Sequence, residues 1–194
     1  MKKSQSMTAA ALGIAALVAT FTLGGAGAAS AKTPDPSETA ASSGTSCWLD
    51  ADTGQSLCVP TGEDLIAAVQ EQVGVSIALP PDFTMNGVSS AELRADTSAG
   101  SLATATTLIP VSEIFDDINY GGGYYLLSGT GCGATISNLA NYGWNDRASS
   151  FKSFNGCLTS IWKNSGFTGT QLGYATNKSS FGSMNDQASS WATA

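Results

Sequence analysis

The stretches that decide the fold are FDDINYGG at residues 115–122 and NDRASS at residues 145–150, because the chain contains each of them twice. WKNSGFTG at residues 162–169 repeats the first as aromatic-x4-aromatic-x-Gly, and NDQASS at residues 185–190 repeats the second. The order is the same in both copies. Self-similarity of this kind indicates a duplicated supersecondary unit, here of about forty residues.

Short aromatic strands and Gly-rich turns dominate both copies, which is typical of β structure. Asn155-Gly156 lies where one copy gives way to the next. Because Asn-Gly favours the positive φ angles of a type I′ turn, we predict a hairpin that joins the two halves here. Thirteen of the sixteen aromatic residues follow residue 110. We therefore expect an all-β sandwich with the larger core in the C-terminal part of the chain.

The two repeated motifs together resemble the paired Greek-key motifs of microbial βγ-crystallins. This resemblance covers roughly residues 111–194 and implies an all-β, two-Greek-key sandwich. The stretch SNLANYGWNDRASSFKSFNG at residues 137–156 also resembles secreted actinobacterial proteins grouped with the Streptomyces metalloproteinase inhibitor. In such a fold the repeated aromatic residues pack in the core and at the corners rather than forming a ligand platform.

The Asn-Asp loops have the composition of a calcium site, because Ca²⁺ takes six to eight oxygen ligands from carboxylates, carbonyls, hydroxyls and water. Asp146 and Asp186 offer carboxylates, and Ser149 and Ser189 offer hydroxyls. The resemblance implies that each site is shared between the halves and takes a further carbonyl from the aromatic corner. Each loop begins with an asparagine, and the residue after its aspartate need offer only a carbonyl. The predicted metal residues are Ile118, Asn145, Asp146, Arg147, Ser149, Ser165, Asn185, Asp186, Gln187 and Ser189.

Matching the positions assigns these residues to two weak Ca²⁺ sites, with the two aspartates supplying the charge. One site combines Ile118, Ser149 and Gln187. The other combines Ser165, Ser189 and Arg147. The alternative is that the Asn, Asp and Ser side chains only build the turns that end Greek-key loops, and bind nothing.

The N-terminus has the pattern of a secretory signal peptide, which we place at residues 1–31. Two lysines precede an apolar run that ends in Ala29-Ser30-Ala31. The Pro-, Ser- and Thr-rich residues 32–46 predict a flexible linker. We therefore expect an extracellular protein with no membrane span once the signal peptide is removed.

Residues 47–110 form a small acidic segment, which we expect to be α+β. Thr61 and Asp64 resemble a capping box, and the apolar face from Leu65 to Val73 predicts one amphipathic helix that ends at Gly74. Residues 75–79 predict a short strand. The repeated domain follows at residues 111–194.

The four cysteines predict two disulfides, because an even number in an exported chain favours disulfides over metal ligands. CWLDADTGQSLC is nearly symmetric about its acidic turn, which predicts a hairpin closed by Cys47–Cys58. The other two cysteines lie within the repeats, so we predict Cys132–Cys157, although four cysteines allow three connectivities.

The composition excludes several functions. The chain has 194 residues, 8 Lys and Arg against 15 Asp and Glu, and no histidine. Without histidine there is no Ser-His-Asp or Cys-His relay, so we expect no enzyme, and the acidic balance disfavours nucleic-acid binding. Two hypotheses stay open: a calcium-binding module, or a peptidase inhibitor whose disulfide-braced loop occludes an extracellular protease. In either case we expect a monomer.

Overall fold

The computed structural model describes residues 44–85, 88–91, 93 and 106–194. The predicted signal peptide and all but the last three residues of the predicted linker lie outside these residues. Within the described part, no helix is both long and apolar enough to cross a membrane.

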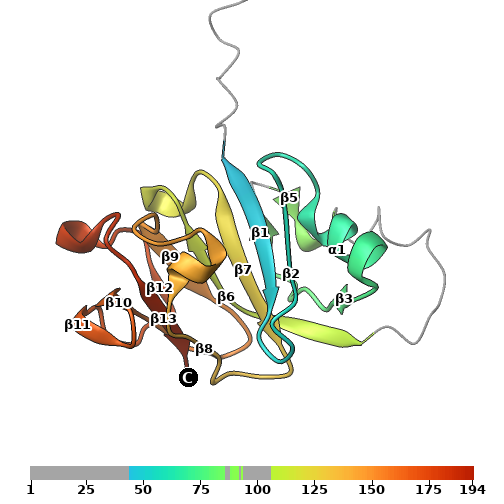
Figure 1. The fold of residues 1–194 in the computed structure, drawn as a ribbon. Helices are drawn as coiled ribbons and strands as arrows, with labels where there is room; N and C mark the ends of the chain where they lie inside the picture. Colours follow the sequence, from blue (N-terminus) through green and yellow to red (C-terminus); the bar gives the residue numbers. More distant parts are fainter. Residues whose placement is uncertain (1–43, 86–87, 92, 94–105) are drawn as a thin grey trace, which may run out of the picture. The chain divides into compact units, whose positions relative to one another are not determined.

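The described chain is built mainly of short strands, with one α-helix and three 3-10 turns (Figure 1). The strands of the N-terminal segment are β1 (Thr45–Asp50), β2 (Ser56–Pro60), β3 (Ser76–Ile77), β4 (Thr84–Met85) and β5 (Val88–Ser89), and its helix is α1 (Leu65–Val73). The first repeat contains β6 (Thr107–Phe115), η1 (Ile118–Tyr120), β7 (Tyr124–Gly129), β8 (Thr135–Ile136), η2 (Leu139–Tyr142) and β9 (Ser150–Ser153). The second contains β10 (Thr159–Asn164), β11 (Thr168–Gln171), β12 (Asn177–Lys178), η3 (Gly182–Met184) and β13 (Ser190–Thr193).

The two repeats form two interlocked Greek keys. The first sheet has the order β12-β9-β6-β7-β1-β2, and the second sheet has the order β11-β10-β13-β8. The third strand of each repeat, β8 or β12, therefore lies in the sheet made by the other repeat. This exchange is the same in both directions, so the predicted all-β sandwich of two Greek keys is confirmed.

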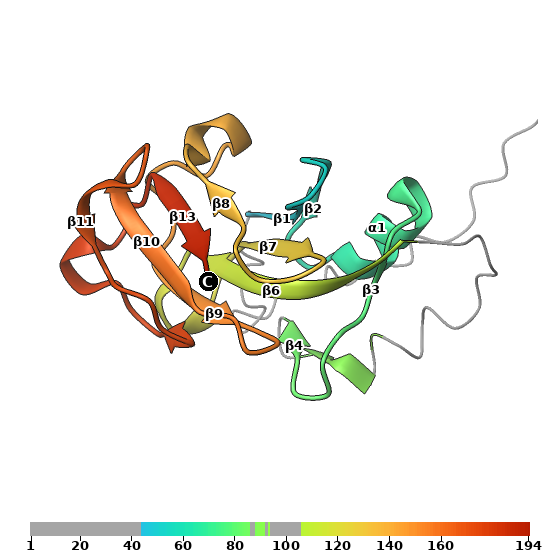
Figure 2. The ribbon, with the colours of Figure 1, turned by 90° about the horizontal axis from the view of Figure 1, so that it is seen from below.

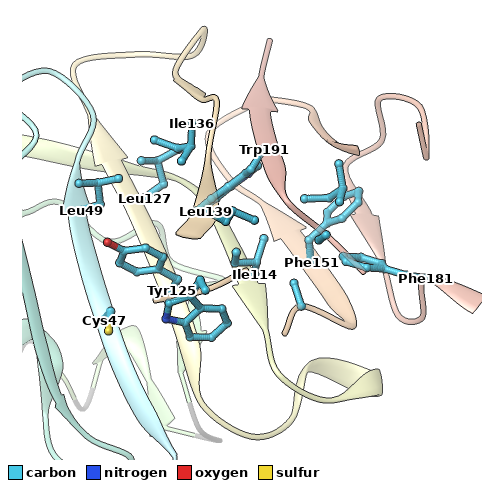
Figure 3. Close-up of a cluster of buried hydrophobic side chains, with 14 of the residues drawn as sticks. Cys47, Leu49, Ile114, Tyr125, Leu127, Ile136, Leu139, Phe151, Phe181 and Trp191 are labelled. Atoms are coloured by element: carbon cyan, nitrogen blue, oxygen red, sulfur yellow. The ribbon is translucent and has the colours of Figure 1, made fainter. Parts of the chain in front are cut away.

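The main core lies between the two sheets, where inward-facing side chains of both repeats meet (Figure 3). Trp191 from β13 and Phe151 from β9 are fully buried there. Tyr125 from β7 stacks on Trp144, with 5.6 Å between the ring centroids. Rings of this size each bury a large apolar area, and five of the buried residues of this core are aromatic.

The N-terminal segment extends the first sheet. Strand β1 pairs in parallel with β7, and β2 pairs antiparallel with β1 with Cys47 opposite Cys58 (Figure 1). Both predicted disulfides are confirmed: Cys47–Cys58 closes this hairpin, and Cys132–Cys157 joins the β7–β8 connection to the turn after β9. Strand β3 pairs in parallel with the start of β6.

Helix α1 covers the outer face of the first sheet and forms a second core there. Its N-cap is Asp64, whose Oδ1 accepts a hydrogen bond from the Ala67 amide at 3.0 Å, rather than Thr61 as predicted. Its C-cap is Gly74 in the left-handed conformation, as the sequence indicated. The second core joins residues of the N-terminal segment to Leu108, Phe115, Tyr124 and Leu126 of β6 and β7. The first sheet is therefore buried on both faces.

The structure bears on two local predictions, the hairpin at Asn155-Gly156 and the domain boundary after residue 110. Asn155 and Gly156 have φ angles of 54° and 79°, as a type I′ turn requires, but the predicted hairpin is wrong. The turn leads from β9 in the first sheet to β10 in the second, so the flanking strands do not pair with each other. The proposed domain boundary between residues 110 and 111 falls inside β6, a single long and curved strand (Figure 2).

Candidate functional site

The two Asn-Asp loops lie side by side. Each follows a 3-10 turn, η2 or η3, and leads into the last strand of its repeat, β9 or β13. The Asp146 amide donates to the Ala188 carbonyl at 2.9 Å, and the Asp186 amide donates to the Ala148 carbonyl at 3.2 Å. The halves thus meet through one reciprocal pair of backbone hydrogen bonds.

Both aspartates have the same unusual backbone conformation. The φ angle is 56° at Asp146 and 54° at Asp186, in the left-handed region that short polar residues tolerate best. The preceding asparagine orients each carboxylate: Asn145 Nδ2 donates to Asp146 Oδ2 at 2.7 Å, and Asn185 Nδ2 donates to Asp186 Oδ2 at 3.0 Å. The asparagine of each Asn-Asp pair therefore holds the neighbouring carboxylate in a fixed orientation at the surface.

The second serine of each motif fastens its loop to the aromatic corner. Ser150 Oγ accepts from the Tyr120 amide at 3.1 Å and donates to the Asp117 carbonyl at 2.6 Å. In the other half, Ser190 Oγ accepts from the Phe167 amide at 3.1 Å and donates to the Asn164 carbonyl at 2.7 Å. No role was predicted for these serines from the sequence, although each of the two motifs contains one at the same position.

One carboxylate meets a hydroxyl from the opposite half. Ser149 Oγ donates to Asp186 Oδ1 at 2.7 Å, and Ser149 itself is buried. The structure thus brings together Ser149 of the first predicted site and Asp186, one of the two aspartates expected to supply the charge. Ile118 and Gln187 were expected to offer only carbonyls, and in the described part of the chain neither is hydrogen-bonded to this pair. The Gln187 side chain donates instead to the Ser183 carbonyl at 3.0 Å.

The other predicted site differs because Arg147 occupies the position of Gln187. Its Nε and Nη2 donate to the two carboxylate oxygens of Asp116 at 2.9 and 2.8 Å. The guanidinium also lies 4.2 Å from the ring centroid of Trp144. Ser165 accepts a hydrogen bond at its carbonyl from the Thr168 hydroxyl, and Ser189 is buried. A positive charge therefore adjoins the first loop and has no counterpart in the second.

The oxygen set suits a hard cation better than a soft one. Among the described residues, no group of three or more His, Cys, Asp and Glu could hold a metal ion. One acceptor in the second loop is, however, left over: Asn185 Oδ1 is buried and has no hydrogen-bond partner. A buried amide oxygen without a donor is costly, and a cation is one of the species that satisfies it.

A buried carboxyl lies outside the loops and was missed by the sequence analysis. Glu113 of β6 is fully buried on the outer face of the first sheet, and both its oxygens lack hydrogen-bond partners. Burial raises the pKa of this carboxyl from 4.5 to about 8, and the Lys152 ammonium offsets part of that shift. Lys152 stands directly opposite Glu113 on β9.

No protein-family model matches the chain, and no curated protein matches it. Solved structures do. The N-terminal domain of protein S is 25% identical and matches over 43% of this chain and 94% of its own, with a TM-score of 0.38. A betagamma-crystallin domain from Clostridium beijerinckii is 28% identical over 43% of this chain and 95% of its own, with a TM-score of 0.36. A beta gamma crystallin from Ciona intestinalis is 25% identical over 43% of this chain and 98% of its own, with a TM-score of 0.36.

The repeated region has a βγ-crystallin-like fold. Two observations support this assignment. Strands β8 and β12 are exchanged between the sheets, and Ser150 and Ser190 make equivalent hydrogen bonds to the aromatic corners of the two halves. Each of these matches covers less than half of this chain. The extra strands β1 and β2 of the N-terminal segment lie at the β7 edge of the first sheet.

Proposed function

We propose that the chain is a secreted, non-catalytic module in which the two Asn-Asp loops bind Ca²⁺. The observation that supports this most strongly is the contact of Asp186 Oδ1 with Ser149 Oγ from the opposite half. A site shared between the halves requires such an approach of a carboxylate and a hydroxyl. A loop that only forms the end of its own Greek key needs no contact with a hydroxyl of the other half.

The oxygen atoms that these residues offer are of the types that bind calcium. Asp186 and Ser149 offer a carboxylate and a hydroxyl, and the unpartnered Asn185 Oδ1 adds a neutral oxygen nearby in the same loop. Ile118 and Gln187 would complete the set through their backbone carbonyls. One carboxylate among neutral oxygens gives a weak site, as in other extracellular calcium modules.

The two sites are unequal in this proposal. Arg147 carries its charge beside the first loop, and its pairing with Asp116 offsets that charge only in part. The site of Ser165, Ser189, Arg147 and Asp146 is therefore the weaker one. When bound, Ca²⁺ would supply a link between loops of the two halves and so stabilise their contact.

Secretion is part of the proposal and rests on the sequence of residues 1–31 together with the two disulfides of the described chain. Disulfides persist in oxidising compartments. Detection of the processed chain in culture medium, with an N-terminus after Ala31, would support it, and retention of the full chain inside the cell would oppose it.

The test of calcium binding is a titration of the purified chain after treatment with a chelator. If free Ca²⁺ reaches about one hundred times the dissociation constant, the free energy of unfolding should rise by about 2.7 kcal/mol. Mg²⁺ should act much less, because it demands octahedral geometry and loses water reluctantly. An unfolding curve that does not move between chelator and millimolar Ca²⁺ would leave the turns-only interpretation standing.

Single substitutions then locate the ion. Asp186→Asn keeps the shape of the side chain and removes its charge, so it should abolish most of the calcium-dependent stabilisation. Glu71→Gln, on the exposed side of α1, removes the same charge and should leave the calcium response unchanged. Asp146→Asn should have the smaller effect of the two loop variants, and equal effects would contradict the proposed inequality of the sites.

The alternative, a peptidase inhibitor, stays a prediction. The loop braced by Cys132–Cys157 is present, and a rigid loop loses little entropy when it docks. Inhibition assays against metallo- and serine proteases, run beside the calcium titration, separate the two functions.

A further inference from the structure

A cavity of about 330 Å³, lined by both polar and aromatic side chains, lies where the N-terminal segment meets the edge of the first sheet. Its lining residues come from β4 of the N-terminal segment and from β9, β12 and their neighbours in the first sheet. The side chains that matter for its chemistry are Asp82, Thr84, Tyr120, Lys152, Phe154 and Asn177. Both the N-terminal segment and the βγ-crystallin part are needed to form it.

Lys152 brings a positive charge that is in no ion pair with a carboxylate of the described residues. Its Nζ lies 4.7 Å from the ring centroid of Tyr120 and 5.6 Å from that of Phe115. The ion pair found among the described residues is Arg147–Asp116, so neither Asp82 nor Glu113 is within 4.0 Å of the ammonium. Glu113, its cross-strand neighbour, is buried and protonated at neutral pH, since its pKa is raised to about 8. An anionic group in the cavity would therefore meet an available cation.

The remaining groups favour a hydroxylated ligand. Thr84 and Tyr120 carry hydroxyls, Asn177 carries an amide, and Asp82 carries a carboxylate that accepts hydroxyl hydrogen bonds. The Tyr120 hydroxyl is only loosely engaged, at 3.4 Å from Asn177 Oδ1. Phe154 adds an aromatic surface. A simple carboxylate would use the lysine and leave the hydroxyls, the amide and the Asp82 carboxylate without ligand partners.

We infer that this cavity binds an acidic monosaccharide, with the sugar carboxylate at Lys152 and the ring hydroxyls at Asp82, Thr84 and Asn177. A sugar ring with one carboxylate uses both the single cation and the several hydroxyl partners. The site is separate from the Asn-Asp loops and needs no calcium.

The test is calorimetric titration of the purified full chain with glucuronate, glucose and acetate. Glucuronate should bind, and glucose and acetate should each bind roughly tenfold more weakly, because each lacks one half of the proposed contacts. Equal binding of glucose and glucuronate would overturn the role of Lys152. Equal binding of acetate and glucuronate would overturn the sugar, and no binding of glucuronate at millimolar concentration would overturn the site.

Variants separate this site from general surface charge. Lys152→Met keeps the aliphatic stem and should weaken glucuronate binding by roughly tenfold, whereas Lys163→Met, at the exposed end of β10, should not change it. Thr84→Val removes a hydroxyl from the exposed face of β4 without touching the cores, and should weaken binding by about threefold. If Lys152→Met fails to fold, Thr84→Val still decides: unchanged affinity in that variant contradicts the inference.

Discussion

Replacing Glu113 by glutamine should remove a large pH dependence from the stability of this protein. The folded carboxyl has a pKa raised from 4.5 to about 8 because it is buried without hydrogen-bond partners. Between these two values the folded chain holds a proton that the unfolded chain has released. Stability contributed by this group is therefore fully present below about pH 4.5 and is lost as the pH rises towards 8.

The size of the effect follows from the linkage relation. One proton gives a slope of about 1.4 kcal/mol per pH unit, so the free energy of unfolding should fall by about 3 kcal/mol between roughly pH 5.5 and 7.5 from this group alone. Glu113→Gln keeps a neutral side chain of the same shape at every pH. The difference in unfolding free energy between the two proteins should thus move by about 3 kcal/mol in favour of the variant over that range.

The assay is urea unfolding at several pH values, followed by tryptophan fluorescence, because Trp48, Trp144 and Trp191 are fully buried. Glu71→Gln is the matched control, since Glu71 is exposed and its removal should leave the pH profile unchanged. If the wild type and Glu113→Gln differ by the same amount at every pH, Glu113 does not hold a proton in the folded chain, and the reasoning is refuted.

Three further outcomes are expected, each measured as the free energy of unfolding in urea. Ser190→Ala should lower the free energy of unfolding by about 2 kcal/mol, because it leaves a corner amide and a corner carbonyl without a hydrogen-bond partner. A loss below about 0.5 kcal/mol would show that these two hydrogen bonds do not hold the loop to the corner. Leu126→Ala should cost about 2 to 5 kcal/mol if the outer face of the first sheet is a true core, whereas an exposed face would lose little. Gly122→Ala should destabilise more than Gly173→Ala: both have φ near 75°, but only at Gly122 would the new Cβ lie 2.8 Å from Asp117 Oδ2, while nothing lies within 4 Å at Gly173.

The sequence predicted those features that depend on local chemistry. The Asn-Asp loops and the aromatic corners form within single repeats, so their residues could be found by comparing the repeats with each other. The hairpin of Cys47 and Cys58 was predictable for the same reason, because its two strands are joined by one short turn.

Non-local pairing was not predictable in the same way. Asn155 and Gly156 fix the type of their turn, but nothing in that turn decides which sheet the next strand joins. Glu113 lies between Ser112 and Ile114, and these neighbours do not show whether its face of the strand meets water or a core. Only the docking of a segment some fifty residues away buries that face, and no period in the sequence records such docking.

The hairpin of β1 and β2 also decides what the first sheet offers to other molecules. A strand at the edge of a sheet has unpaired backbone groups, and a long regular edge invites a second chain to add to it. Here β1 pairs with Tyr125–Ser128 of β7, so the edge on this side of the sheet is β2. That strand is five residues long, ends at Pro60, and is tied to β1 by Cys47–Cys58. Reduction of this disulfide would allow β2 to separate from β1, which would promote edge-to-edge aggregation of the first sheet.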